Sequence, residues 1–382
     1  MRLALREMVR RPGQFMTAAV LLTLIAMLLM LLGGLLDGLI ARSTGAIRAQ
    51  RADLVVFSAT AEQSFLRSRI TPATRAQVAA VPGVTSVSGI GVTQLGARIP
   101  GNGPRDLADV ALFGYQQAPD GVPAPPAAGE VWADSILQDN GVKQGQTLQL
   151  GPARSEVKVV GFVDDVSYSG AGSLWADAAT WREVQNANRP ASSVGPGVFQ
   201  ALLVRTSGDP SAVADAIDKA TADNSGADTA AASAGSATET VSLATASDAI
   251  GGVKQQRSVF NQIIGVTLVI AAVVVALFFA LLTVERVGLY GVLKAIGARS
   301  RTLFAGVVAQ ATVVALTAAA VGTVFAVLLD VLLPPGAIPY QLLPSRVVIS
   351  GVSLLIAAVV GSSFSLRRVL RVDPASAIGR AS

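Results

Sequence analysis

Few residues of this sequence have the chemistry of a catalytic or metal site. The chain contains no cysteine and no histidine, which excludes disulfide frameworks, Cys/His zinc sites and histidine-based triads. Asp164 and Asp165 are adjacent carboxylates after a predicted strand, a pattern that is more typical of a solvated loop than of a metal or acid–base pair. The spacing of Gly89, Gly91 and Gly96 does not fit G-x-G-x-x-G, so no dinucleotide site is predicted.

The segment 285–301, ERVGLYGVLKAIGARSR, offers a docking surface instead of a reactive group. Its apolar residues follow the i, i+3, i+4, i+7 pattern of one face of a short helix. These residues are Leu289, Val292, Leu293 and Ile296. Glu285, Arg286, Tyr290 and Lys294 complete the candidate docking residues. Because a helix of this length is marginal alone, we expect it to lie against another surface.

A second group of candidate residues lies in the first apolar stretch. Gly34 and Gly38 form a G-x-x-x-G motif, a spacing that lets helices approach closely. With Met30 and Asp37 they form a candidate surface for a substrate or for a second copy of the chain. The simpler interpretations are ordinary helix packing for the glycines, gap filling for Met30 and, for Asp37, a carboxylate near the membrane interface, where its charge costs little.

The composition is that of a membrane protein. Of the 382 residues, 51% are hydrophobic and 14% are charged, against about 25% charged residues in soluble domains. Four stretches are long and apolar enough to cross a bilayer, which takes about 20 helical residues. Although the net charge is +5, the basic residues flank the apolar stretches and are not accompanied by stacking aromatics, so nucleic acid is not an expected partner.

The flanking charges predict the topology. Basic residues cluster before the first span, between the second and third, and after the fourth, which predicts that both termini lie in the cytoplasm. The expected order is a cytoplasmic interfacial helix (1–12), span 1 (13–41), an extracytoplasmic α+β domain (42–257), span 2 (258–284), the docking helix (285–301), span 3 (302–329), an external loop (330–346), span 4 (347–366) and a cytoplasmic tail (367–382).

The extracytoplasmic segment is large enough for its own core. Strands are predicted at Asp53–Ser58, Asp109–Phe113, Glu156–Val163 and Phe199–Val204, which are rich in β-branched or aromatic residues. Thr71–Val81 is predicted as a helix with Thr71 as its N-cap, Pro72 in its first turn and Pro82-Gly83 as its end. Thr221–Thr240, almost purely small and polar, is expected to be a flexible tether or a mobile loop.

The chain resembles the MacB/FtsX-like permease family, the membrane subunits of type VII ABC systems. The resemblance rests on the four spans with a large external domain after the first, on the LKAIGA run at 293–298, and on the ending RRVLRVDPASAIG at 367–379. It implies that ATP and Mg bind to a separate ABC ATPase, which is present in two copies. The segment 285–301 would couple these ATPase subunits to two copies of this chain in the lipid bilayer of a bacterial plasma (inner) membrane. This chain would then have no cofactor of its own. The absence of a G-x-x-x-x-G-K-[ST] loop supports that division of labour, because this chain then cannot cradle ATP in a P-loop.

Two functions fit these features best, and a third fits poorly. The first is ATP-driven export or extraction of a hydrophobic or amphipathic substrate. The second is mechanotransmission, in which motion driven from inside regulates an extracytoplasmic protein without transport. A plain membrane-anchored receptor does not account for four spans and a docking helix.

Overall fold

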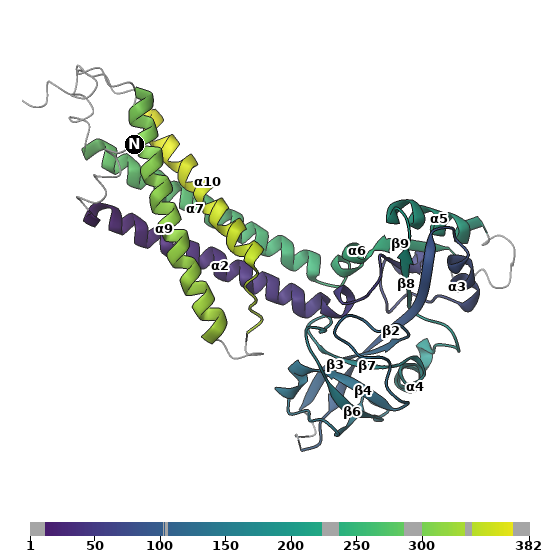
Figure 1. Cartoon of the computed structure of the whole chain (residues 1–382). Coiled ribbons are helices and arrows are strands. Elements are labelled where there is room, and N and C mark those ends of the chain that lie inside the picture. The colour runs from purple at the N-terminus through teal and green to yellow at the C-terminus, as the bar shows by residue number, and fades with distance from the viewer. Residues whose placement is uncertain are drawn as a thin grey trace, which may run out of the picture. The chain divides into compact units, whose positions relative to one another are not determined.

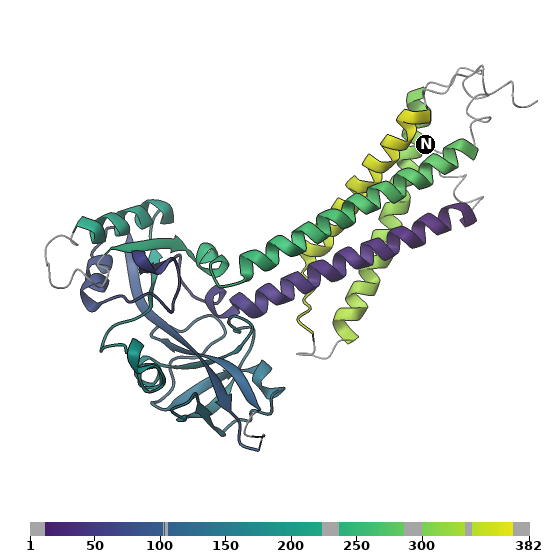
Figure 2. The same ribbon diagram turned by 180° about the vertical axis from the view of Figure 1, so that it is seen from behind.

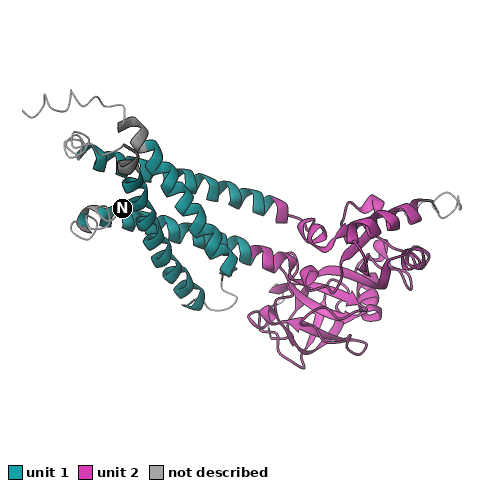
Figure 3. Ribbon diagram, turned by 45° about the horizontal axis from the view of Figure 1, so that its top comes forward, with its two compact units in different colours: residues 1–38, 255–382 teal, residues 39–254 magenta. Residues whose placement is uncertain are grey.

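The computed structural model describes residues 12–101, 103, 106–223, 237–285, 300–332 and 338–369. The described chain divides into two compact units (Figure 3). Unit 1 comprises residues 1–38 and 255–382, and unit 2 comprises residues 39–254. Both boundaries fall inside helices, because α2 (Pro12–Arg48) and α7 (Val253–Glu285) each carry the chain from one unit into the other.

Unit 1 is a bundle of long apolar helices, seen from opposite sides in Figures 1 and 2. It contains most of α2 and α7, together with α9 (Ser300–Leu332) and α10 (Pro344–Val369). Each of these helices has a stretch long and apolar enough to cross a membrane. Side chains from all of them form one core, for which Leu22, Val275, Val314 and Leu354 are examples.

The outer faces of the unit 1 helices are also apolar. Large hydrophobic side chains are exposed along each helix, including Leu24 on α2, Leu277 on α7, Val324 on α9 and Phe364 on α10. Soluble proteins rarely expose apolar surface on this scale. A bundle that is apolar both inside and outside is what a lipid environment requires.

Unit 2 is built on one long sheet in the order β3-β7-β4-β6-β5-β2-β8-β1-β9. The described strands are β1 (Leu54–Ser58), β2 (Val84–Arg98), β3 (Leu107–Tyr115), β4 (Glu130–Asp134), β5 (Thr147–Leu150), β6 (Ser155–Val163), β7 (Gly172–Asp177), β8 (Ala201–Thr206) and β9 (Thr238–Ser242). Because β3 also pairs with β2, the part from β3 to β2 closes on itself around a core that includes Leu112, Val131 and Leu148. Helix α4 (Ala178–Asn188) adds Trp181 and Val184 to that core.

The remaining part of the sheet, β2-β8-β1-β9, has a core on each face. Helices α3 (Pro72–Ala79) and α5 (Pro210–Asp223) cover one face, where Val78 and Ile217 meet Val56 and Val204. The other face is covered by the last turns of α2 and by α6 (Leu243–Asp248), which contributes Ala246.

All three tryptophans of the chain, at positions 132, 175 and 181, lie in unit 2.

The predicted fold class is confirmed, with one local error. All four predicted strands are present, as β1, β3, β6 and β8, and Thr71 caps α3 by accepting a hydrogen bond from the Thr74 amide. The predicted tether Thr221–Thr240 was wrong at its ends. Thr221 is fully buried in α5 and its hydroxyl lies 2.8 Å from that of Thr238 in β9. Small polar residues are ordered here because they satisfy one another inside the fold, and residues 224–236 lie outside the described part.

Candidate functional site

The predicted docking helix can be followed only at its first residue. Glu285 is the last residue of α7 and is exposed. The other candidate docking residues lie outside the described residues: Arg286, Leu289, Tyr290, Val292, Leu293, Lys294 and Ile296. Their role in docking therefore stays a prediction. The described helices α7 and α9 end and begin on either side of this segment.

The second group of candidate residues faces partners within the same chain. Met30 is buried in unit 1, and the Thr323 hydroxyl of α9 lies 3.6 Å from its sulfur. One turn earlier, a Cβ on Gly322 of α9 would lie 2.9 Å from the Cβ of Ala26. The two helices therefore approach each other closely at Met30, which packs inside the bundle of one chain.

Asp37 forms an ion pair that joins α2 to α10. Arg346, in the first turn of α10, donates from Nε to Asp37 Oδ2 at 2.8 Å and from Nη2 to Oδ1 at 2.5 Å. The pair is bidentate and largely shielded, with side-chain exposures of 10% for Asp37 and 20% for Arg346. Such a paired geometry is the strong form of a charged hydrogen bond. Asp37 is thus a paired and largely buried carboxylate.

The glycines of α2 provide the trough in which this contact is made. A Cβ on Gly33 would lie 2.4 Å from Arg346 Cδ, and one on Gly34 would lie 2.4 Å from the ring of Tyr340. On Gly38 it would lie 2.1 Å from the backbone oxygen of Pro339. No side chain fits at these positions without movement of the neighbouring segment. The G-x-x-x-G motif thus serves a close approach inside this chain, whereas a role between two copies stays a prediction.

Backbone and hydroxyl groups complete the contact. The Gln341 amide donates to the Gly34 carbonyl at 3.0 Å, and the Tyr340 hydroxyl donates to the Ala326 carbonyl of α9 at 3.4 Å. Burial, and next to it the charge of Asp330, raise the pKa of Tyr340, so its hydroxyl keeps the proton it donates. We call this group the clasp; its residues are Gly33, Gly34, Asp37, Gly38, Pro339, Tyr340 and Arg346. Sequence reasoning missed Pro339, Tyr340 and Arg346, because no local pattern in the sequence relates them to α2.

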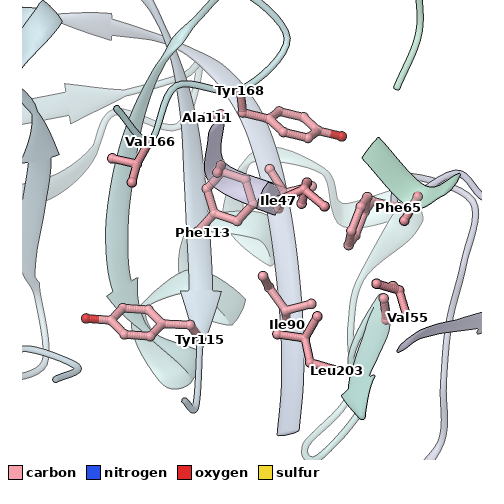
Figure 4. Close-up of a cluster of buried hydrophobic side chains, with 14 of the residues drawn as sticks. Ile47, Val55, Phe65, Ile90, Ala111, Phe113, Tyr115, Val166, Tyr168 and Leu203 are labelled. Carbon is pink, nitrogen blue, oxygen red and sulfur yellow. The ribbon is translucent and has the colours of Figure 1, made fainter. Parts of the chain in front are cut away.

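A separate feature, within unit 2, holds the last turns of α2. Ala46 and Ile47 are fully buried among Phe113, Tyr168 and other core side chains (Figure 4). The loop after β6 fixes this helix end through backbone hydrogen bonds from Ala46 N to Ser167 O, from Ser169 N to Ser43 O and from Gly170 N to Arg42 O. We call residues 42–47 and this loop, residues 164–171, the α2 anchor. The helix that begins in unit 1 thus ends as part of the unit 2 core.

A buried carboxylate supports the anchor loop from behind. The Ser167 hydroxyl donates to Asp134 Oδ2 at 2.5 Å, and the Ile136 amide donates to Oδ1 at 3.3 Å. Burial raises the pKa of Asp134 above its usual range, against the lowering effect of these hydrogen bonds.

The loop of the α2 anchor borders an open hollow of about 450 Å³, which is lined in part by Gln94, Asp109 and Ser169. In the parts of the chain that the structure describes, no cluster of three acidic side chains is arranged to hold a metal ion.

Comparisons with known proteins relate this chain to membrane permeases. Residues 261–374 match the family described as FtsX-like permease, C-terminal. Over 389 aligned residues, the chain is 28% identical to an uncharacterised ABC transporter permease of Mycobacterium tuberculosis, and the alignment covers 98% of each chain. The chain carries an FtsX-like permease domain and is similar to an ABC transporter permease over its whole length. The matched region covers most of α7, all of α9 and α10, and the predicted docking segment between α7 and α9.

Shorter alignments relate the permease to further proteins. A second uncharacterised ABC transporter permease of Mycobacterium tuberculosis is 40% identical over 115 residues, which is 29% of this chain and 31% of that one. A putative hemin transport system permease, HrtB of Staphylococcus haemolyticus, is 32% identical over 133 residues, covering 35% and 37% of the two chains.

Two solved extracytoplasmic regions are structural neighbours of the permease. The extracellular domain of YknZ, a noncanonical ABC-type transporter of Gram-positive bacteria, aligns with a TM-score of 0.33 at 13% identity over 50% of this chain and 98% of that one. The periplasmic region of MacB from Actinobacillus actinomycetemcomitans aligns with a TM-score of 0.33 at 14% identity over 56% and 95%.

Proposed function

We propose that this permease couples ATP hydrolysis by a separate ATPase subunit to the export or extraction of a hydrophobic or amphipathic substrate. The observation that carries the proposal is the course of α2. This helix contributes Phe15, Leu22 and Leu29 to the membrane bundle and Ala46 and Ile47 to the core of unit 2. Because one continuous helix contributes to both cores, a movement of its membrane part would be transmitted to the core of unit 2.

The docking segment between α7 and α9 is where the ATPase would act. Two ATPase subunits close on ATP and Mg at the cytoplasmic side and press on the apolar face around Leu289, Leu293 and Ile296. Since α7 ends at Glu285 and α9 begins at Ser300, both helices would receive this push. Two copies of the permease, in a bacterial plasma membrane with both termini in the cytoplasm, complete the assembly.

The surface of the bundle supports the proposed class of substrate. The helices expose apolar side chains such as Val269 and Leu277 of α7, so a molecule that partitions into the bilayer can reach them from the side. One relative is named as a putative hemin transport permease, and hemin is an amphipathic molecule. We therefore use hemin as the first probe of a panel of amphipathic compounds.

The test is reconstitution of the permease with its ATPase in lipid vesicles. Compounds are screened for stimulation of ATP hydrolysis, and those that stimulate are then followed across or out of the bilayer. We expect movement that requires ATP and stops with an ATPase unable to hydrolyse it. Stimulated hydrolysis without movement of any stimulating compound would contradict export.

The second candidate function is mechanotransmission to an extracytoplasmic protein. The observation in its favour is the hollow beside the α2 anchor, because the amides of Ser169 and Gly170, which line it, also hold the carbonyls of Ser43 and Arg42. A protein bound there would contact the loop that holds α2. ATP-dependent change in the activity of a bound extracytoplasmic enzyme, with no compound moved, would favour this function.

A further inference from the structure

Unit 1 is held together in two different ways along α2. Its first half packs into the apolar core through Phe15, Ala18, Leu22, Ala26 and Leu29. Beyond Leu29 that core has no further member on α2 among the described residues. Met30 still contacts Thr323 of α9, and the contacts that follow along the helix within unit 1 include those of the clasp. One half of the helix is therefore fixed by broad apolar packing and the other by a few directional polar contacts.

These two kinds of contact respond differently to a force on the helices. Apolar packing is the sum of many weak contacts, so a small shift weakens it gradually. A bidentate ion pair and two hydrogen bonds depend on exact geometry and are either made or lost. Because the trough at Gly33, Gly34 and Gly38 has no side chains to interlock with its partner, opening of the ion pair between Asp37 and Arg346 would leave the hydrogen bond from the Gln341 amide to the Gly34 carbonyl as a polar contact across the trough.

We propose that the clasp is a release point in the transport cycle, with Asp37 and Arg346 as gating residues. Closed, it holds the second half of α2 against Pro339, Tyr340 and α10. Open, it frees the stretch of α2 that leads to the α2 anchor and parts α2 from α10 beside the membrane. This inference rests on the proposed function, since opening must be driven by the ATPase.

The structure supplies a cross-link that locks the clasp. A Cβ on Gly33 would lie 3.0 Å from Arg346 Cγ, and one further bond of about 1.5 Å reaches Arg346 Cβ. The two Cβ atoms are then no more than about 4.5 Å apart, within the usual span of a disulfide. Gly33→Cys with Arg346→Cys therefore places the only two thiols of an otherwise cysteine-free chain in bonding range.

A matched control joins two helices without touching the clasp. A Cβ on Gly351 of α10 would lie 4.0 Å from the Cβ of Ala319 of α9. Gly351→Cys with Ala319→Cys thus forms a disulfide of the same chemistry within the same bundle. It leaves α2 unconstrained, so it tests the effect of a cross-link as such.

Both variants are reconstituted with the ATPase in lipid vesicles, and ATP hydrolysis is measured before oxidation, after oxidation and after reduction. The locked clasp should lower hydrolysis about tenfold and reversibly, because a gate that cannot open stops turnover. The control should stay within about twofold of its reduced form, since its cross-link lies away from the moving contact. Tryptophan fluorescence and co-purification of the ATPase show that the oxidised chains remain folded and assembled.

The outcomes separate the two proposals. Hydrolysis that is the same in the oxidised and reduced Gly33→Cys/Arg346→Cys protein would show that the clasp is only a structural support, and the gating role would be overturned. If even the native chain gives no hydrolysis with the ATPase, the proposed function fails and the gating role fails with it. Loss on oxidation alone, restored by reductant, supports both.

Discussion

A single methyl group at position 45 should loosen the α2 anchor. Gly45 lies against the anchor loop, and a Cβ added there would be 2.5 Å from the Asp165 carbonyl oxygen and 3.2 Å from the Ser167 amide nitrogen. An ordinary contact needs about 3.5 Å, so helix and loop must separate by about 1 Å. Both neighbouring atoms belong to the backbone, so no side-chain rotation relieves the clash.

The size of the effect follows from the contacts that this shift disturbs. The bond from Ala46 N to Ser167 O, now 3.0 Å, would lengthen to about 4 Å and be lost, which costs about 1 kcal/mol. Overpacking adds about 1–3 kcal/mol, and the better helix propensity of alanine returns about 1 kcal/mol. We expect Gly45→Ala to lower the free energy of unfolding of unit 2 by about 1–3 kcal/mol, a fall in Tm of about 3–9 °C.

The assay uses the tryptophans as reporters. Because all three lie in unit 2, their fluorescence during thermal or urea unfolding of the full chain in detergent follows that unit. Gly13→Ala is the matched control, since it lies in the same helix with no atom within 4 Å of the added Cβ. A Gly45→Ala protein as stable as the Gly13→Ala protein would refute the assignment of the anchor.

Two further predictions concern topology and the buried carboxylate. Single cysteines at Ser207 and Ser376 should react differently with a membrane-impermeant thiol reagent on whole cells: only Ser207→Cys is expected to label, and labelling of Ser376→Cys would reverse the proposed orientation. The raised pKa of Asp134 means that folding favours its protonated form, a contribution that is complete below the unfolded-state pKa of about 3.9 and lost as the pH rises through the higher folded value. The stability of the native chain relative to Asp134→Asn should therefore decline as the pH rises from about 4, and a pH-independent difference would show that Asp134 titrates normally.

Local patterns in the sequence were sufficient where one element carries its own signal. The N-cap at Thr71, followed by proline, predicted α3, and β-branched runs predicted strands such as β1 and β8. The four apolar stretches similarly indicated the membrane helices. In each case the residues that form the element also determine its secondary structure, without a partner elsewhere in the chain.

Features that depend on distant partners could not be predicted. Arg346 is 309 positions from Asp37, and nothing near either residue indicates the other. Gly91 of β2 gave no strand signal, because its role is to make room for Trp181, whose Cζ2 would lie 2.1 Å from an added Cβ. The order of Thr221 and Thr238 likewise depends on hydrogen bonds that form only when α5 and β9 come together.

The central claim is that a separate ATPase binds the docking segment and that its ATP hydrolysis drives movement of this chain through that contact. The direct measurement is ATP hydrolysis by the purified permease alone, by the permease with its ATPase, and by the ATPase with the Leu293→Asp permease. We expect no hydrolysis from the permease alone, stimulation in the native complex, and loss of ATPase binding and stimulation with Leu293→Asp, because an unpaired charge in a buried interface costs several kcal/mol of association. Unchanged tryptophan fluorescence would show that unit 2 of the variant remains folded. Undiminished binding and stimulation by the Leu293→Asp protein would contradict the account.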